Sequence, residues 1–170
     1  MPSSERVAVL VVPQWQGYAA DDRPRLGALA IAAALGTATH TITVPAWHPL
    51  PVEPAGGTGV VRGLDEIVRQ AASVLTWLET TRPARLLVIG GDCGSDLAPI
   101  LWQSGRARAE LGVLYLDAHA DLNTPASSPS GRFHGMVLRT ALGDGAPVLT
   151  ALGPRAITAG QLVMAGTRDL

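Results

Sequence analysis

The sequence predicts an α/β fold, a three-layer αβα sandwich in which helices cover both faces of a mostly parallel β-sheet. Three observations support this prediction. Short, unbroken apolar runs are typical of strands buried on both faces. Segments of helical character separate these runs, and polar, glycine-containing segments directly follow two of them. Strands that alternate with helices form βαβ units with parallel strands, and functional sites in such sheets lie beyond the carboxyl ends of the strands.

The first part of the chain predicts a strand, a helix and a second strand. Residues 7–12 are unbroken and rich in β-branched side chains, which favours a buried strand. The helix that follows can be capped by Asp21 or Asp22 and ends before Gly36. Its body is apolar nearly all round, so we expect it to be well buried. Residues 41–44 then predict a short strand.

A loop and an amphipathic helix come next. Residues 45–59 hold four prolines and three glycines, which excludes a regular element. Apolar residues at helical spacing predict a helix over residues 64–78, and Arg82-Pro83 ends it. Because the segments on either side of the loop are each too small to fold alone, we expect residues 1–170 to form one domain.

Three further strands are predicted at residues 86–89, 113–116 and 162–165. Ser95 is the expected cap of a helix after the first of these, and a short helix is expected near residues 134–142. The sequence Gly-Gly-Asp-Cys follows the first strand, and Asp-Ala-His-Ala-Asp follows the second. Four of the nine aspartates lie between Asp92 and Asp121, which supports a functional site at these strand ends.

Composition excludes several classes of function. With a net charge of −1 over 170 residues, the chain offers no argument for nucleic acid or an anionic membrane as a partner. All its basic residues are arginine, which excludes a Schiff-base lysine and a P-loop. Cys93 is the only cysteine, so no intrachain disulfide is possible and a reducing cytoplasm is the expected location. We predict neither a signal peptide nor a membrane-spanning segment.

Asp117, His119 and Asp121 alternate with alanines directly after residues 113–116. In extended backbone, alternate side chains share a face, so two carboxylates and one imidazole would converge there. Such donors can hold a divalent metal, and hard carboxylates favour Mn, Mg or Fe. The metal would lower the pKa of a bound water and produce hydroxide near neutral pH. The alternative is a capped strand end whose carboxylates are only solvated.

The stretch DAHADLNTP, followed after Ala126 by SSPSGRFHG, resembles the signature of the arginase and agmatinase superfamily, the manganese ureohydrolases. GGD at residues 90–92 is similar to the family's earlier GGDH motif, and GTRD at residues 166–169 resembles a later strand end of the family. The resemblance is close over residues 90–95 and 114–135 and loose over the rest of the chain. It implies an arginase-like fold and a small guanidino compound as substrate.

The resemblance also implies a binuclear Mn²⁺ centre. Asp117, His119 and Asp121 would be manganese ligands, with Asp121 or Asp117 bridging two ions. Metal-activated hydroxide would attack the guanidinium carbon of the substrate, and the tetrahedral intermediate would collapse to urea and an amine. We expect the protein to form a homo-oligomer.

Further residues match substrate-binding and catalytic positions of the family. Asn123 and Ser130 match positions that hold the α-carboxylate end of the amino acid in arginases, and they favour an arginine-like substrate. His134 matches the histidine credited with proton shuttling and, with Asp121, forms the expected catalytic set. As alternatives, Asn123 is a turn residue before Thr-Pro, and His134 is an imidazole at a helix N-terminus.

The sequence departs from the family pattern in two ways. Cys93 stands where the family has a histidine ligand, and a softer thiolate favours Zn, Fe or a single metal. Alternatively, Cys93 is a small buried residue at a strand end. Nothing in the chain matches the family's later SxDxDxxDP motif, and family members are about twice as long, so we expect a domain truncated at its C-terminus. The third and fourth strands would then lack the strands that separate them and expose apolar edges.

Three functional hypotheses follow. The first is an arginase-family hydrolase that cleaves a guanidino C–N bond. The second is an inactive, truncated homologue that acts as a non-enzymatic or partner-dependent subunit. The third, a nucleotide-binding α/β module, is disfavoured because no G-x-G-x-x-G follows the first strand.

Overall fold

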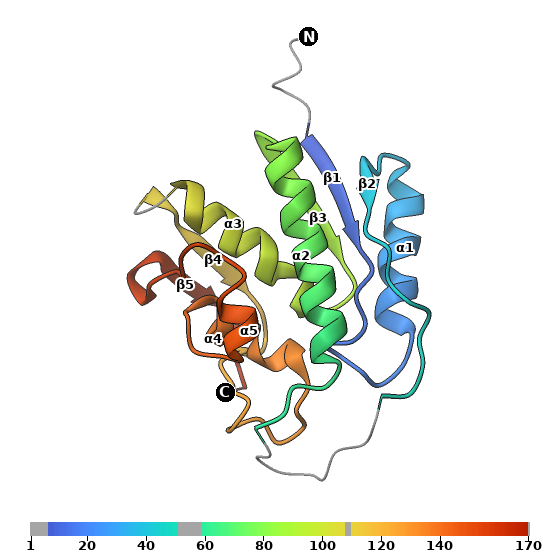
Figure 1. Cartoon of the computed structure of the whole chain (residues 1–170). Coiled ribbons are helices and arrows are strands. Elements are labelled where there is room, and N and C mark those ends of the chain that lie inside the picture. The colour runs from blue at the N-terminus through green and yellow to red at the C-terminus, as the bar shows by residue number, and fades with distance from the viewer. Residues whose placement is uncertain (1–6, 51–58, 108–109, 170) are drawn as a thin grey trace.

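The computed structural model describes residues 7–50, 59–107 and 110–169, in which strands and helices alternate along the chain (Figure 1). The strands are β1 (Val7–Val12), β2 (His40–Thr41), β3 (Arg85–Gly90), β4 (Val113–Leu116) and β5 (Leu162–Ala165). The α-helices are α1 (Arg23–Leu35), α2 (Leu64–Thr81), α3 (Leu97–Ala107), α4 (Val137–Ala141) and α5 (Pro147–Thr150). The described residues also form the short 3₁₀ helices η2 (Cys93–Asp96), η4 (Phe133–Met136) and η5 (Ala159–Gln161).

The strands form two parallel sheets. The first has the order β2-β1-β3, and the second pairs β4 with β5. Each β1 residue from Val7 to Val12 pairs with its partner between Arg85 and Gly90, and all strand pairs in the described residues are parallel. β3 and β4 are not hydrogen-bonded to each other, so within the described residues each of them has one unpaired edge.

The first sheet is the centre of a three-layer arrangement, which confirms the predicted fold class. Alternate residues of a strand point to opposite faces. Accordingly, Val9 and Val11 of β1 pack with Ala28 of α1, whereas Leu10 and Val12 pack with apolar residues of α2 and α3. Figure 1 shows α1 and α2 on opposite sides of this sheet.

The second sheet is covered on one face only. Tyr115 of β4 is buried in the larger core cluster with residues of α3, α4 and α5. On the opposite face, Leu114, Leu116 and Val163 are 63%, 72% and 61% exposed. The prediction that residues 113–116 form a strand buried on both faces is therefore wrong, because no described element packs against this second face.

The predicted burial of the first helix is also wrong. In α1 only Ala28 is buried, and Leu26 and Ile31 are each 53% exposed. This helix covers the sheet with a single narrow stripe, so an apolar composition all round does not bury it on all sides. The second strand is shorter than predicted, ending at Thr41, although the next residue, Ile42, is buried.

The helix after β3 begins differently from the prediction. Ser95 does not cap it. Instead, the side chain of Asp92 accepts a hydrogen bond from the Gly94 backbone N–H and caps η2, which leads into α3. The short helix near residues 134–142 is present as η4 and α4. Part of the predicted loop, residues 51–58, lies outside the described residues, and no described helix has the length and hydropathy to cross a membrane.

Candidate metal centre and adjoining pocket

The glycine pair at the end of β3 brings two chain segments into contact. A Cβ atom on Gly91 would collide with the backbone carbonyl of Gln14, and one on Gly90 would collide with the Ser95 hydroxyl. The Gly91 N–H also donates to the Val12 carbonyl at 3.0 Å. Because no side chain intervenes, the segments that follow β1 and β3 pack backbone to backbone at the carboxyl edge of the first sheet.

Replacement of Gly91 by alanine tests this contact. The new methyl group meets backbone that cannot rotate away, so Gly91→Ala is expected to lower the free energy of unfolding by about 1–3 kcal/mol. The matched control is Gly160→Ala, because nothing lies within 4 Å of a Cβ there. Urea denaturation followed by circular dichroism compares the two. Equal midpoints for both variants would contradict the close approach.

Asp92 holds the segment that carries Cys93. Its carboxylate accepts hydrogen bonds from the backbone N–H groups of Gly94 at 2.8 Å and Tyr18 at 3.0 Å. Burial raises the pKa of Asp92 to about 6, against the lowering effect of these backbone hydrogen bonds. The carboxylate therefore joins two segments that are 74 residues apart and fixes the position of its neighbour Cys93.

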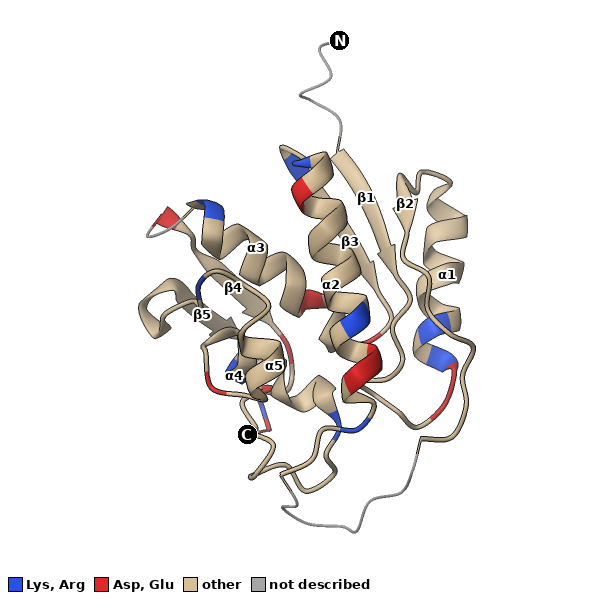
Figure 2. Ribbon diagram, viewed as in Figure 1, with Lys and Arg blue, Asp and Glu red and all other residues tan. Residues whose placement is uncertain are grey.

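Cys93, Asp117 and Asp121 form a cluster of possible metal ligands. Their ligand atoms, one sulfur and two carboxylate oxygens, all lie within 4.8 Å of one another. Cys93 follows β3 and the two aspartates follow β4, so the carboxyl ends of strands from separate sheets meet at this cluster. The acidic residues near these strand ends are visible in Figure 2.

The cluster concentrates negative charge in a partly buried place. Asp121 is 5% exposed, and its Oδ2 accepts a hydrogen bond of 2.6 Å from the Tyr115 hydroxyl. Burial raises the pKa of Asp121, with a further contribution from the Asp117 carboxylate, against the lowering effect of the Tyr115 bond. Burial, with added repulsion from Asp121 and Asp117, raises the pKa of Asp96 to about 6. A bound cation would relieve this repulsion.

The pKa of Cys93 is shifted upward, like the pKa values of Asp121 and Asp96. Burial raises the pKa of the Cys93 thiol, and the nearby carboxylates, led by Asp121, raise it further. A thiol in such surroundings stays protonated unless a cation binds it, because a coordinating thiol is deprotonated by the metal.

His119 lies at the edge of the cluster. Its side chain is 67% exposed, and its Nδ1 lies 3.4 Å from an Asp117 carboxylate oxygen. That oxygen also accepts a hydrogen bond from the His119 backbone N–H at 2.9 Å, and Asp121 has a positive φ of 51°. The segment therefore does not stay extended, although His119 still lies beside Asp117 and lines the same pocket as Asp121.

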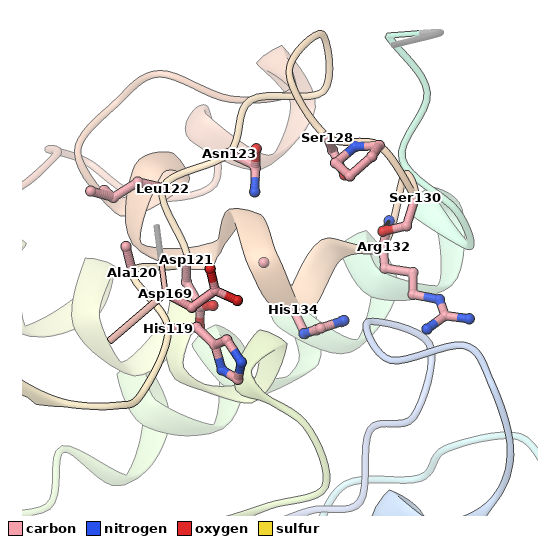
Figure 3. Close-up of a pocket in the computed structure, with 12 residues that line it drawn as sticks. His119, Ala120, Asp121, Leu122, Asn123, Ser128, Ser130, Arg132, His134 and Asp169 are labelled. Carbon is pink, nitrogen blue, oxygen red and sulfur yellow. Dashed lines mark hydrogen bonds between the residues drawn. The ribbon is translucent and has the colours of Figure 1, made fainter. Parts of the chain in front are cut away.

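A pocket of about 350 Å³ opens beside the cluster (Figure 3). Among its lining residues are Asp121, His119, His134, Asn123 and Ser130. In Figure 3 His134 and Asp121 lie on the same side of this pocket, and Asn123 and Ser130 lie on the loop around it. Five of the seven side chains that the sequence singled out are thus brought together around one cavity, and the other two, Cys93 and Asp117, complete the neighbouring cluster.

His134 lies in η4, held against the segment after β1. Its backbone N–H donates to the Gly17 carbonyl at 3.2 Å, and its ring centroid lies 5.9 Å from that of Tyr18. Burial lowers the pKa of His134, although the Asp121 carboxylate opposes the shift. The imidazole is therefore neutral at neutral pH and able to accept a proton.

The two polar residues on the loop have local partners as well as pocket contacts. The Asn123 side-chain oxygen accepts a hydrogen bond from the Ser127 hydroxyl at 3.0 Å, as a turn residue would. The Ser130 hydroxyl accepts one from the Arg132 backbone N–H at 3.3 Å. Both side chains nevertheless line the pocket, so the turn and pocket positions are compatible for Asn123.

Comparison with known proteins decides the family. The sequence profile of the arginase family matches residues 6–170. The chain belongs to the arginase family. It is 40% identical to an arginase from Entamoeba histolytica over 87 residues, which are 50% of this chain and 29% of that protein. It is 42% identical to an arginase from Brevibacillus brevis over 113 residues, 63% of this chain and 37% of that one.

Solved arginase structures agree with this assignment. The crystal structure of Entamoeba histolytica arginase in complex with L-ornithine superposes with a TM-score of 0.78 at 28% identity, covering 96% of this chain and 58% of that chain. The Bacillus caldovelox arginase gives a TM-score of 0.70 at 25% identity, covering 95% and 57%. This arginase-family chain thus spans about three fifths of the length of these structures and about a third of the curated relatives it matches.

Three residues of this arginase-family site carry charges that sequence reasoning did not assign to it. The Asp121 charge contributes to the raised pKa of Asp96. Arg132 and Asp169 line the pocket. Asp169 reaches it because its backbone pairs with that of His119 in a parallel bridge. The GTRD motif at residues 166–169 marked this strand end, but only the fold brings it beside residue 119.

Proposed function

We propose that this protein is a metal-dependent hydrolase of the arginase family that cleaves a guanidino C–N bond of an arginine-like substrate to give urea and an amine. One observation carries the proposal. The ligand cluster of Cys93, Asp117 and Asp121 adjoins the pocket of about 350 Å³ into which His134 and Asn123 face. A pocket of this size suits a small amino acid derivative.

The donor set fits a divalent ion. Asp117 and Asp121 supply hard oxygens and Cys93 supplies a sulfur, and together they would hold the ion beside the pocket. Mn²⁺ is the ion of the family, and the sulfur donor makes Zn²⁺ and Fe²⁺ alternatives. His119, at the rim of the cluster beside Asp117, is a further ligand under this proposal. The ion would lower the pKa of a water and so supply hydroxide near neutral pH.

The chain's own residues would bind the substrate and move its protons. The amide of Asn123 and the hydroxyl of Ser130 would donate hydrogen bonds to the α-carboxylate, which directs the guanidinium toward Asp121. After attack on the guanidinium carbon, the C–N bond breaks and the departing amine needs a proton. His134, neutral at rest, would take up a proton from the water and deliver it to that amine.

Urea release tests the proposal directly. The purified chain, loaded separately with Mn²⁺, Zn²⁺ and Fe²⁺, is incubated with arginine, agmatine and other guanidino compounds, and urea is measured colorimetrically. We expect urea from an arginine-like substrate, and none after treatment with a chelator. The absence of urea from every substrate with every metal would overturn the proposal.

Replacement of His134 separates proton transfer from metal binding. His134→Asn is expected to lower kcat about 10²–10⁴-fold, because it removes a group that moves protons in the reaction. The affinity for the metal should not change, since His134 lies outside the ligand cluster. His40→Asn is the matched control, because this histidine is exposed in β2 and stacks on Trp77 away from the pocket. Equal loss of activity in both variants would contradict the assigned role.

A non-catalytic, partner-dependent role is the second candidate, favoured by the open edges of β3 and β4. Leu114 and Leu116 are exposed on β4, next to its unpaired edge. A partner polypeptide could cover these apolar side chains. Equilibrium dialysis distinguishes the two functions. Two tightly bound Mn²⁺ ions per isolated chain would contradict the partner-dependent role, and urea release by the isolated chain would exclude it.

A further inference from the structure

Cys93 places a sulfur atom among the carboxylate oxygens of the candidate metal centre. It approaches from the end of β3, whereas Asp117 and Asp121 approach from the end of β4, and the three ligand atoms lie within 4.8 Å of one another. The tetrahedral ligands of a zinc ion are about 3.4–3.6 Å apart, given Zn–S and Zn–O bonds of about 2.3 and 2.1 Å. Small side-chain rotations are therefore enough to close the three donors around one ion.

The surroundings of the cluster hold these donors in place. The Tyr115 hydroxyl donates to Asp121 at 2.6 Å, which orients that carboxylate. Asp92, with its two backbone hydrogen bonds, fixes the turn that presents Cys93. Partners of this kind typically change metal affinity 10–100-fold, because they orient the ligands before the ion binds.

We propose that Cys93 makes this centre prefer a thiophilic divalent metal, Zn²⁺, over Mn²⁺. The inference rests on the proposed function in so far as the cluster is taken to bind a metal. The ion displaces the thiol proton to solvent and is held by Cys93, Asp117 and Asp121. Soft thiolate ligands select zinc, whereas carboxylate and water ligands suit manganese.

Cobalt spectroscopy and cysteine alkylation test the proposal on the whole chain without measuring turnover. Co²⁺, which substitutes for Zn²⁺, is expected to give an intense near-ultraviolet charge-transfer band from sulfur to metal. Because Cys93 is the only cysteine, its reaction with iodoacetamide reports on one site. Zn²⁺ should slow this alkylation in proportion to the occupancy of the site, and Mn²⁺ at the same concentration should not.

Two variants provide matched controls. Cys93→Ser keeps the size of the side chain and removes the sulfur, so it should lose the cobalt band and bind Zn²⁺ at least about 100-fold more weakly. Cys93→His should lower the ratio of Zn²⁺ to Mn²⁺ affinity at least about tenfold, because imidazole is a harder donor. Where a variant fails to fold, the cobalt band and the alkylation of the natural chain decide alone.

The outcomes separate this inference from the proposed function. A chain that binds Mn²⁺ more tightly than Zn²⁺, or gives no sulfur-to-cobalt band, overturns the inference even if it releases urea. A chain that binds one Zn²⁺ through Cys93 and releases no urea with any metal supports the inference and overturns the proposed hydrolase.

Discussion

Asp121→Asn is expected to weaken the binding of a divalent ion by at least about 100-fold. Loss of a residue that only hydrogen-bonds to a metal ligand typically weakens binding by about 10–100-fold, and loss of a ligand should cost more. Asp121 is the most buried member of the ligand cluster, and its charge is what the amide removes. Asparagine tolerates the positive φ of 51° at this position, so the backbone need not change. Isothermal titration with Zn²⁺ and Mn²⁺ measures the loss, and urea release should fall with it.

The same substitution should not destabilise the metal-free chain. Because the pKa of Asp121 is raised in the folded state, its contribution to stability is present at acid pH and is lost as the pH rises through that pKa. At neutral pH the folded chain bears the cost of keeping the Asp121 carboxylate charged in a buried place beside Asp117, and a neutral amide does not have this cost. In the presence of a chelator, thermal unfolding of Asp121→Asn should therefore occur at or above the temperature of the natural chain. A large drop would mean that the carboxylate is structural rather than a metal ligand.

Phe133→Ala is expected to lower the free energy of unfolding by about 3–5 kcal/mol, a large part of the total stability of a domain this size. Phe133 is fully buried in the larger core cluster, and its ring lies against Gly94, beside Cys93. The ring therefore supports both η4, which carries His134, and the turn that carries Cys93. Chemical denaturation monitored by tryptophan fluorescence measures the loss.

Val163→Ala is the control for this prediction. Val163 is also apolar, but it lies on the uncovered face of β5 and is 61% exposed. Its truncation should change the free energy of unfolding by less than about 0.5 kcal/mol. If the two variants lose similar stability, the core around Phe133 is not packed as described.

Most of the regular elements could be predicted from local patterns. The apolar runs at β1, β3, β4 and β5 and the helical spacing of apolar residues in α2 all appear where they were expected. These signals are local, because a run of apolar residues and its period of repetition are properties of neighbouring positions. How far each element is buried could not be predicted, because it depends on which other elements cover it, as α1 and β4 show.

The site could be predicted only in part. Functional sites lie beyond the carboxyl ends of parallel strands, which is why a site was expected at the Gly-Gly-Asp-Cys and Asp-Ala-His-Ala-Asp segments. The extended backbone assumed for residues 117–121 was wrong, because the Asp117 carboxylate accepts a hydrogen bond from the His119 backbone N–H and Asp121 has a positive φ. Local hydrogen bonds of this kind compete with extended backbone, and a pattern of alternating residues does not reveal them.

The sequence by itself determined which segments become strands and helices, which polar residues follow the strands, and that one of these is a cysteine. Only the tertiary structure decided that Cys93 joins Asp117 and Asp121 while His119 turns to the rim. The physical reason is that this grouping depends on contacts between distant segments. One example is the hydrogen bond from the Tyr18 N–H to Asp92, across 74 residues, and another is the packing of Phe133 beside Gly94. No local pattern encodes such contacts, because they form only when the sheets and loops have packed.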